Sequence, residues 1–187
     1  VKVMMSTVPF DKITIKSICK EANVSVGTFY IYFKSKEEAL LYSHRYVDER
    51  FVDYDFQGES NINEKLKMVV DTYLKSILEE DFEYIQQIYI AHIKCYSADM
   101  FASKRILASL LIELIDQGKA LKIVNPNVDS NVIAQGIMRN VRGHVYDYCI
   151  NPNKRNRENW YSCAKQELDY FIPFYVAKGC EINKTIE

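Results

Sequence analysis

The chain has 187 residues, a formal net charge of −1 and 48% hydrophobic residues. This hydrophobic share supports a full core, and the near-neutral charge excludes a protein that binds polyanions over its whole surface. No apolar run approaches the roughly 20 residues that a membrane-spanning helix needs, so we expect no membrane partner. No signal peptide is visible, and the five cysteines have no metal-ligand spacing. These features favour a cytoplasmic protein with reduced thiols, no cofactor and no metal, although a redox pair among Cys95, Cys149 and Cys163 stays open.

Two short helices are predicted near the start of the chain. Thr14 precedes a run of apolar residues at helical spacing, as a helix N-cap does, and Asn23 tolerates the left-handed conformation that ends a helix. Ser25 is the N-cap candidate of the second helix, in which Phe29 and Phe33 are four residues apart and should face the core together. Two short helices joined by a tight turn form a helix-turn-helix, whose second helix can enter the major groove of DNA.

A third helix is predicted to begin after Ser35, with Glu38 completing a capping box. Lys36 lies in its first turn, where a cation opposes the helix dipole, and this cost suggests a phosphate partner. Charge also points to this end of the molecule, because residues 1–36 carry a net charge of +4 and the remainder carries −5. A local basic patch on a mildly acidic body fits a protein that docks one end on DNA.

These segments resemble the DNA-binding head of the TetR family of bacterial transcription regulators. The likeness lies in Ile13-Thr14, in the run from Val24 to Phe33, and in Ser35-Lys36-Glu37. The resemblance implies that the DNA-binding residues are Thr14, Lys16, Ser25, Val26, Gly27, Thr28, Tyr30, Tyr32 and Lys36. Base contacts are expected from Val26 and Thr28. Phosphate contacts are expected from Thr14, Tyr30, Tyr32 and Lys36, and Lys16 is suited to either role.

The resemblance also predicts how the chain is organised. Residues 1–44 form the helix-turn-helix domain, and residues 45–187 form a helical regulatory and dimerisation domain. In the family a longer first helix precedes the corner that corresponds to Pro9-Phe10, so we expect that the N-terminus of the head is truncated in this sequence. The fold class is all-α, with an N-terminal three-helix DNA-binding head and a C-terminal helical ligand-binding and dimerisation body.

Hydrophobic periodicity predicts six further helical segments after the recognition helix. Their ranges are 35–53, 62–80, 82–96, 100–119, 129–148 and 157–177, with a loop over 54–61. Gly118 is expected to end the fourth of these helices. No strand-like alternation of useful length and no internal repeat is present.

The last two helices carry broad apolar faces that must be buried, either against the body or against a second copy of the chain. TetR-like proteins form a four-helix dimer bundle from these helices, so the resemblance favours a homodimer on a palindromic operator. The expected interface residues are Ile137, Val141, Val145, Trp160, Leu168 and Phe171.

The resemblance further implies that the middle helices bind a small-molecule effector, whose identity the sequence does not give. Polar or aromatic residues on apolar helices are the pocket candidates: Tyr73, Tyr89, His92, Tyr96 and His144. A histidine on an apolar helix is more often a satisfied core residue than a ligand contact. The residues together suit a largely apolar ligand with one polar group.

The resulting hypothesis is a sequence-specific DNA-binding transcriptional regulator, namely a repressor that a small molecule releases. The alternative is a DNA-binding regulator that a protein partner controls or that activates transcription, without a small-molecule inducer. An enzyme is disfavoured, because the sequence has no Gly-rich phosphate loop, nucleophile elbow or metal-ligand cluster. A purely structural dimer would leave Gly27, Thr28 and Lys36 without a purpose.

Overall fold

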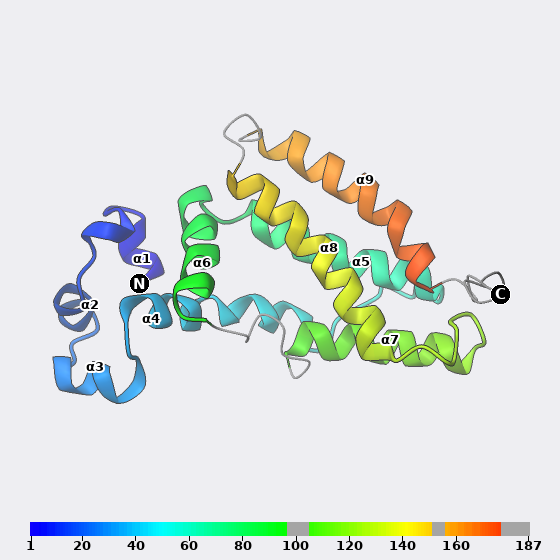
Figure 1. The fold of residues 1–187 in the computed structure, drawn as a ribbon, viewed down its shortest axis with the longest axis horizontal. Helices are drawn as coiled ribbons and strands as arrows, with labels where there is room; N and C mark the ends of the chain where they lie inside the picture. Colours follow the sequence, from blue (N-terminus) through cyan, green and yellow to red (C-terminus); the bar gives the residue numbers. More distant parts are fainter. Residues whose placement is uncertain (97–104, 151–155, 177–187) are drawn as a thin grey trace, which may run out of the picture. The chain divides into compact units, whose positions relative to one another are not determined.

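The structure, a computed structural model, describes residues 1–96, 105–150 and 156–176 (Figure 1). Within these ranges it contains α-helices and two 3₁₀ segments but no strand, which confirms the predicted all-α class. The first helices are α1 (Lys2–Met5), α2 (Ile15–Glu21), α3 (Val26–Tyr32) and α4 (Lys36–Ser43), with 3₁₀ segments η1 (Phe10–Lys12) and η2 (Arg45–Phe51). The later helices are α5 (Ile62–Leu78), α6 (Phe82–Lys94), α7 (Ile106–Ala120), α8 (Ser130–Ile150) and α9 (Arg157–Val176).

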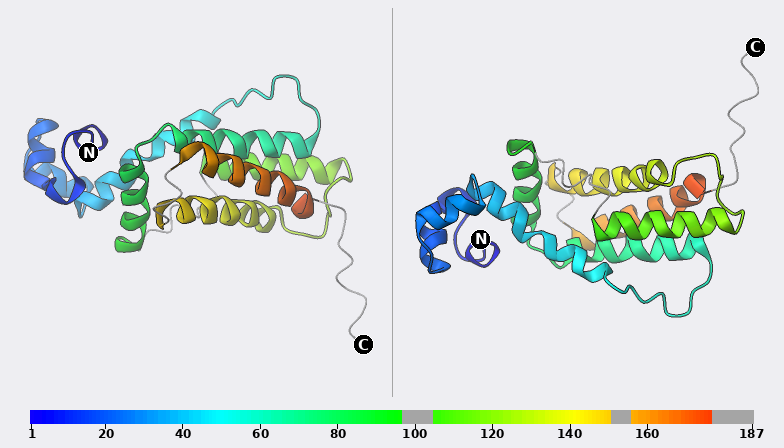
Figure 2. Two further views of the ribbon diagram at one scale, coloured as in Figure 1. Left: turned by 90° about the horizontal axis from the view of Figure 1, so that it is seen from above. Right: turned by 90° about the horizontal axis from the view of Figure 1, so that it is seen from below.

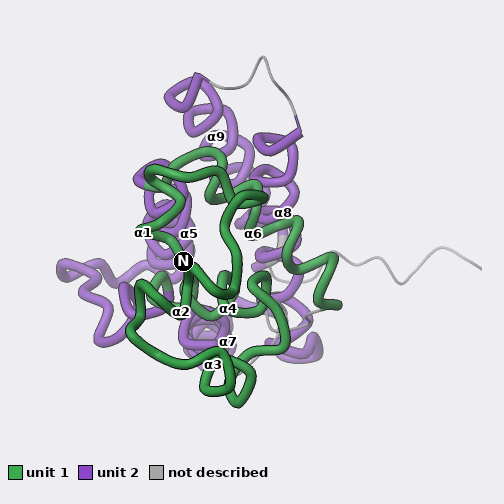
Figure 3. Tube along the Cα trace, turned by 90° about the vertical axis from the view of Figure 1, so that its left-hand side faces the viewer, with its two compact units in different colours: residues 1–47, 80–100 green, residues 48–79, 101–187 purple. Residues whose placement is uncertain are grey.

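The chain divides into two compact units (Figure 3). Unit 1 comprises Val1–Val47 and Glu80–Met100, and unit 2 comprises Asp48–Glu79 and Phe101–Glu187. The predicted domain limit after residue 44 lies near the first crossing between the units. Unit 1 nevertheless includes α6, which the sequence-based division assigned to the body.

In unit 1, α4 packs against α6. The Sγ atom of Cys95, just after α6, lies 3.9 Å from the Oγ atom of Ser35, the N-cap residue of α4. At the other end of this contact the rings of His44 and Tyr84 lie 5.9 Å apart. Leu40 is fully buried within the unit.

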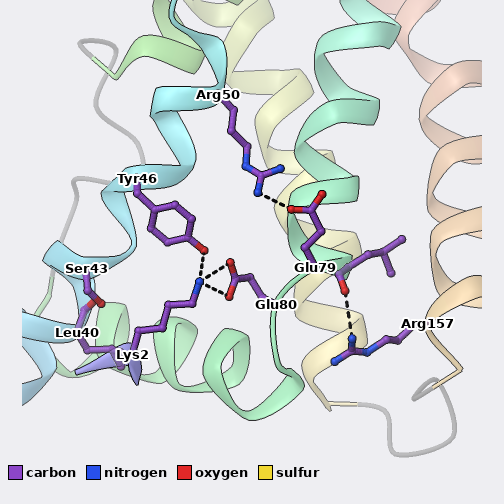
Figure 4. Close-up of polar contacts among 9 residues, drawn as sticks. Lys2, Leu40, Ser43, Tyr46, Arg50, Glu79, Glu80 and Arg157 are labelled. Atoms are coloured by element: carbon purple, nitrogen blue, oxygen red, sulfur yellow. Dashed lines mark hydrogen bonds and ion pairs between the residues drawn. The ribbon is translucent and has the colours of Figure 1, made fainter. Parts of the chain in front are cut away.

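Lys2 of α1 bonds to residues at both borders of unit 1, just before Val47 and at Glu80 (Figure 4). Its ammonium group donates hydrogen bonds of 2.8 Å to the hydroxyl of Tyr46 and to the carboxylate of Glu80. The same group lies 4.4 Å from the centre of the Tyr46 ring, within the range of a cation–π interaction. Because Glu80 is buried, its charge depends on this lysine for compensation.

Unit 2 is a four-helix bundle (Figure 2). Contacts run from α5 to α9, from α9 to α8, from α8 to α7 and from α7 back to α5, and α5 also contacts α8 across the bundle. The apolar stripes of α5 and α8 are buried along their length, which explains why their hydrophobic residues recur at helical spacing.

Charged groups also lie in the interior of unit 2. Arg105, the N-cap residue of α7, donates two hydrogen bonds of 2.8 Å to the two carboxylate oxygens of Asp48. Tyr73 of α5 is fully enclosed beside this pair, and burial raises the pKa of its hydroxyl, although the charges of Arg105 and Arg142 act to lower it. Elsewhere in the unit, Glu79 pairs with Arg50, as Figure 4 shows.

Two helix limits differ from the prediction. The segment expected as one helix over 35–53 changes to 3₁₀ geometry after Ser43, and the crossing between the units lies within this 3₁₀ segment. Gly118 does not end α7, because the helix continues to Ala120 and Lys122 takes the left-handed conformation instead, with φ of 58°. Part of the helix expected over 100–119 and the last residue of the helix expected over 157–177 lie outside the described residues.

Gly118 is required for packing rather than for helix termination. A Cβ atom at this position would lie 2.5 Å from the Cγ2 atom of Val124 and 3.3 Å from that of Ile62, and both neighbours are buried. We therefore expect Gly118→Ala to destabilise the protein by about 1–3 kcal/mol through overpacking, despite the better helix propensity of alanine. Urea denaturation measures the change.

Gly143 supplies the matched control for this substitution. It lies within α8, and a Cβ atom there would meet nothing within 4 Å. Gly143→Ala should stabilise the folded monomer by about 0.5–1 kcal/mol, because it restricts the unfolded chain without a clash inside one chain. Equal effects at the two positions would show that Gly118 is not tightly packed.

Among the helices of the described ranges, none combines the length and apolar character needed to cross a membrane. The same ranges contain no cluster of three or more His, Cys, Asp or Glu side chains that could hold a metal ion.

Candidate nucleic-acid interface

The first helix of the helix-turn-helix is capped as its sequence predicts. The hydroxyl of Thr14 accepts a hydrogen bond of 3.1 Å from the backbone N–H of Ser17, and the hydroxyl of Ser17 accepts one of 3.0 Å from the N–H of Thr14. This reciprocal pair satisfies two N–H groups that the helix cannot. The side chains of Ile18 and Cys19 then anchor α2 in the core of unit 1.

The turn between the two helices depends on Asn23, whose φ of 52° confirms the predicted left-handed helix stop. The backbone N–H of Val24 donates a 2.9 Å hydrogen bond to the carbonyl of Cys19, which closes the end of α2. Two residues later the chain enters α3, so the turn is short enough to hold the two helices in contact.

Ser25 caps α3 as predicted. Its hydroxyl oxygen accepts a 2.9 Å hydrogen bond from the N–H of Thr28 and lies 2.9 Å from the Thr28 hydroxyl. Phe29 holds the helix on the core, with only 4% of its surface exposed, and its ring lies 5.5 Å from that of Phe33. On the other sides of α3, Val26, Tyr30 and Tyr32 are all exposed.

Lys36 differs most from its predicted role. Its ammonium group donates hydrogen bonds of 2.7 Å to the carbonyl of Phe10 and 2.9 Å to that of Ile13, and it lies 4.5 Å from the centre of the Phe10 ring. These acceptors give the cation a structural role at the end of η1. They account for a lysine in the first turn of α4, where the helix dipole disfavours a positive charge, without a phosphate partner. The capping box at Ser35 is also altered, since Glu38 accepts from the N–H of Lys34 rather than from that of Ser35.

The nine residues predicted to bind DNA all lie in unit 1, in or next to α2, α3 and the start of α4. Thr14, Lys16, Ser25, Val26, Gly27, Tyr30 and Tyr32 are exposed, whereas Thr28 and Lys36 are half-buried. Sequence reasoning did not single out Ile31, which is 77% exposed and thus the most exposed large apolar side chain of α3.

The five predicted pocket residues do not form one pocket within either unit. Tyr89, His92 and Tyr96 belong to unit 1, and Tyr73 and His144 belong to unit 2. Tyr96, which follows the end of α6 in a left-handed conformation, is 94% exposed. His144 lies at the α8–α9 contact, 3.6 Å from the carboxylate of Glu167. An open surface hollow of about 490 Å³ in unit 2 is lined by none of these five residues.

Five of the six predicted dimer residues are covered by the chain itself. The buried ones are Ile137, Val141, Val145, Trp160 and Leu168. They are covered within one chain because α8 and α9 turn these stripes toward each other and toward α5 and α7. Phe171 alone of the six is exposed, at 45%.

Comparisons with known proteins agree with the architecture of the first helices. Residues 3–42 match the family model described as bacterial regulatory proteins, tetR family, and this range includes all nine predicted DNA-binding residues. No curated protein sequence matches the chain. A solved structure, described as a structural analysis of the fatty acid degradation regulator FadR from Bacillus halodurans, has a similar fold, with a TM-score of 0.56 and 22% sequence identity. The similarity covers 88% of this chain and 91% of that chain.

Proposed function

We propose that this member of the TetR family of transcriptional regulators binds a palindromic operator as a homodimer and represses transcription until a small molecule releases it. The observation that carries the proposal is α3, a short capped helix that is anchored by Phe29 and exposes most of its other side chains. A helix held in this way can enter the major groove without disturbing its own core. The protein would act in the bacterial cytoplasm, where the operator lies.

The second copy is proposed to dock on the outer faces of α8 and α9. Tyr170, Phe171 and Phe174 form an exposed aromatic cluster on α9, with ring centres 5.3 to 6.4 Å apart. On α8, Tyr146 and Ile150 are exposed and four residues apart. An exposed apolar cluster such as that on α9 marks a protein interface, and a self-complementary one gives a two-fold dimer.

The effector is proposed to bind among the helices of unit 2. Sites for small molecules combine apolar walls with a few polar groups, and the interior of this unit supplies Tyr73, Arg105, Asp48 and Arg142 in an apolar bundle. Because FadR of Bacillus halodurans is a regulator of fatty acid degradation, fatty acids are the first compounds to test for release of DNA. Control by a protein partner would instead leave every small molecule without effect on operator binding.

Selection of bound sequences from random duplex DNA tests the proposal. A homodimer should enrich a palindrome whose half-sites lie about one helical turn apart, and binding should weaken steeply with salt. No enrichment by a folded, dimeric protein would contradict the proposal. An operator that overlaps a promoter supports repression, whereas one upstream of it supports the activator alternative.

Substitutions in α3 should weaken operator binding without unfolding the protein. Tyr30→Ala and Thr28→Ala are each expected to cost about 1 kcal/mol per half-site, the value of a typical hydrogen bond, and thus about 30-fold in the affinity of a dimer. Thr28→Ala leaves the backbone cap on Ser25 in place. Tyr96→Ala removes a tyrosine that is more exposed than Tyr30 and lies outside the proposed interface, and it should leave affinity unchanged. Fluorescence anisotropy with the selected operator measures all three.

A further inference from the structure

Gly27 and Ile31 form the side of α3 that faces away from the protein. Successive helical residues are about 100° apart, so residues two positions before and after Phe29 point in nearly the opposite direction to it. Phe29 is buried and points into the core, whereas Ile31 is 77% exposed and Gly27 is exposed. Residues 27 and 31 are also four apart and therefore adjacent on the helix surface.

Packing within the protein does not require a glycine at position 27 or an isoleucine at position 31. A Cβ atom at Gly27 would meet only the Ser25 hydroxyl oxygen, at an ordinary 3.6 Å, so the fold has room for a side chain there. Ile31 has no polar atom and gains nothing from exposure to water. Helical side chains lean toward the N-terminus of their helix, which places Ile31 over the bare backbone at Gly27. The result is a small apolar projection beside a surface that another molecule can approach closely.

The surroundings of this face suit a polyanion. Residues 1–36 carry a net charge of +4, and α3 itself contains no acidic residue. Lys16 of the adjacent α2 is exposed. An apolar group presented on a helix in a basic setting fits the major groove of DNA, where the apolar feature of the base edges is the C5-methyl group of thymine.

We propose that Ile31 reads a thymine methyl group in each half-site, and that Gly27 allows the edge of that base pair to approach the helix. The inference rests on the proposed function and names a specificity-determining residue for it. The sequence reasoning assigned base contacts to Val26 and Thr28 instead. Thr28, which is half-buried, keeps its proposed hydrogen bond to DNA, and Ile31 is the most exposed large apolar side chain of α3.

The experiment replaces each thymine of the selected operator, one position at a time and in both half-sites together, by deoxyuridine, which lacks only the methyl group. Burial of one methyl group corresponds to about fourfold in affinity, so loss of two should weaken binding about 15-fold at one position. Ile31→Ala should remove this sensitivity, so that the thymine and deoxyuridine operators bind it equally. Anisotropy titrations of the full chain give the four affinities of the cycle.

Two variants serve as controls. Ile93 is 71% exposed and lies in the same unit, so Ile93→Ala is the same change at a similarly exposed position and should retain the full sensitivity to deoxyuridine. Val26→Ala should also retain it. Circular dichroism melts establish that each variant is folded.

The outcomes separate this inference from the proposed function. If an operator is selected but deoxyuridine weakens binding nowhere, or weakens binding of Ile31→Ala as much as that of the original protein, the inference is overturned and the regulator stands. Sensitivity that disappears in Val26→Ala but persists in Ile31→Ala assigns the methyl contact to Val26 and also overturns it. If no sequence is enriched, both proposals fail, and a protein partner becomes the candidate for this face.

Discussion

Replacing Trp160 by alanine is expected to destabilise the protein by about 3–5 kcal/mol, the cost of deleting a large aromatic side chain from a packed core. Trp160 is 3% exposed, and its indole N–H donates a 2.8 Å hydrogen bond to the carbonyl of His144. Its ring lies 4.8 Å from that of Tyr148, so the substitution removes packing and a hydrogen bond from the α8–α9 contact together. Urea denaturation monitored by circular dichroism measures the loss.

Phe171→Ala is the matched change on the same helix. Because Phe171 is exposed and belongs to the aromatic cluster of α9, its loss should change the stability of the monomer little but weaken self-association. Sedimentation over a range of concentrations separates the two effects. If Trp160→Ala dissociated a dimer while the monomer kept its full stability, the burial of Trp160 within one chain would be incorrect.

Asp48→Asn is expected to cause the second large loss of stability, about 3 kcal/mol, toward the lower end of the range for breaking a buried ion pair. Both carboxylate oxygens of Asp48 accept hydrogen bonds from Arg105, and only 11% and 20% of the two side chains are exposed. The substitution removes the charge of Asp48 from beside the guanidinium group and the enclosed Tyr73. Thermal denaturation at neutral pH measures the change.

The pair formed by Lys165 and Asp169 of α9 provides the contrast. Its ammonium and carboxylate groups are 2.7 Å apart, but 39% and 35% of the side chains are exposed. Asp169→Asn should therefore cost no more than about 1 kcal/mol, as is usual for pairs that water screens. Similar losses for the two substitutions would mean that burial does not set the strength of the Asp48 pair.

Local chemistry explains why the helix-turn-helix could be predicted from the sequence. A cap such as Thr14 or Ser25 acts on N–H groups two or three residues away, so its effect is visible in a short stretch of sequence. The left-handed Asn23 is equally local. The helices of unit 2 could be predicted for a related reason, because a buried stripe repeats at the helical period whatever covers it.

The same reasoning explains where sequence-based prediction fails. A buried stripe on α8 is the same whether the chain itself or a second copy covers it, so Val141 and Leu168 could not be distinguished from apolar residues that one chain leaves exposed, such as Phe171. Lys36 bonds to carbonyls more than 20 residues away, at Phe10 and Ile13, and no local pattern reports such a contact. The sequence did not indicate Ile31, because the exposure of an isoleucine can be recognised only once the direction of the core is known.

The division of the chain has a consequence for building chimeric regulators. A head cut after Val47 would retain α4 but lose α6, which packs on it, and would also lose Glu80, the carboxylate partner of Lys2. Fusing such a fragment to the body of another protein would expose apolar surface on α4 and leave an unmatched ammonium group. A transplant of DNA specificity therefore has to carry Glu80–Met100 along with Val1–Val47, or confine itself to the exposed side chains of α3.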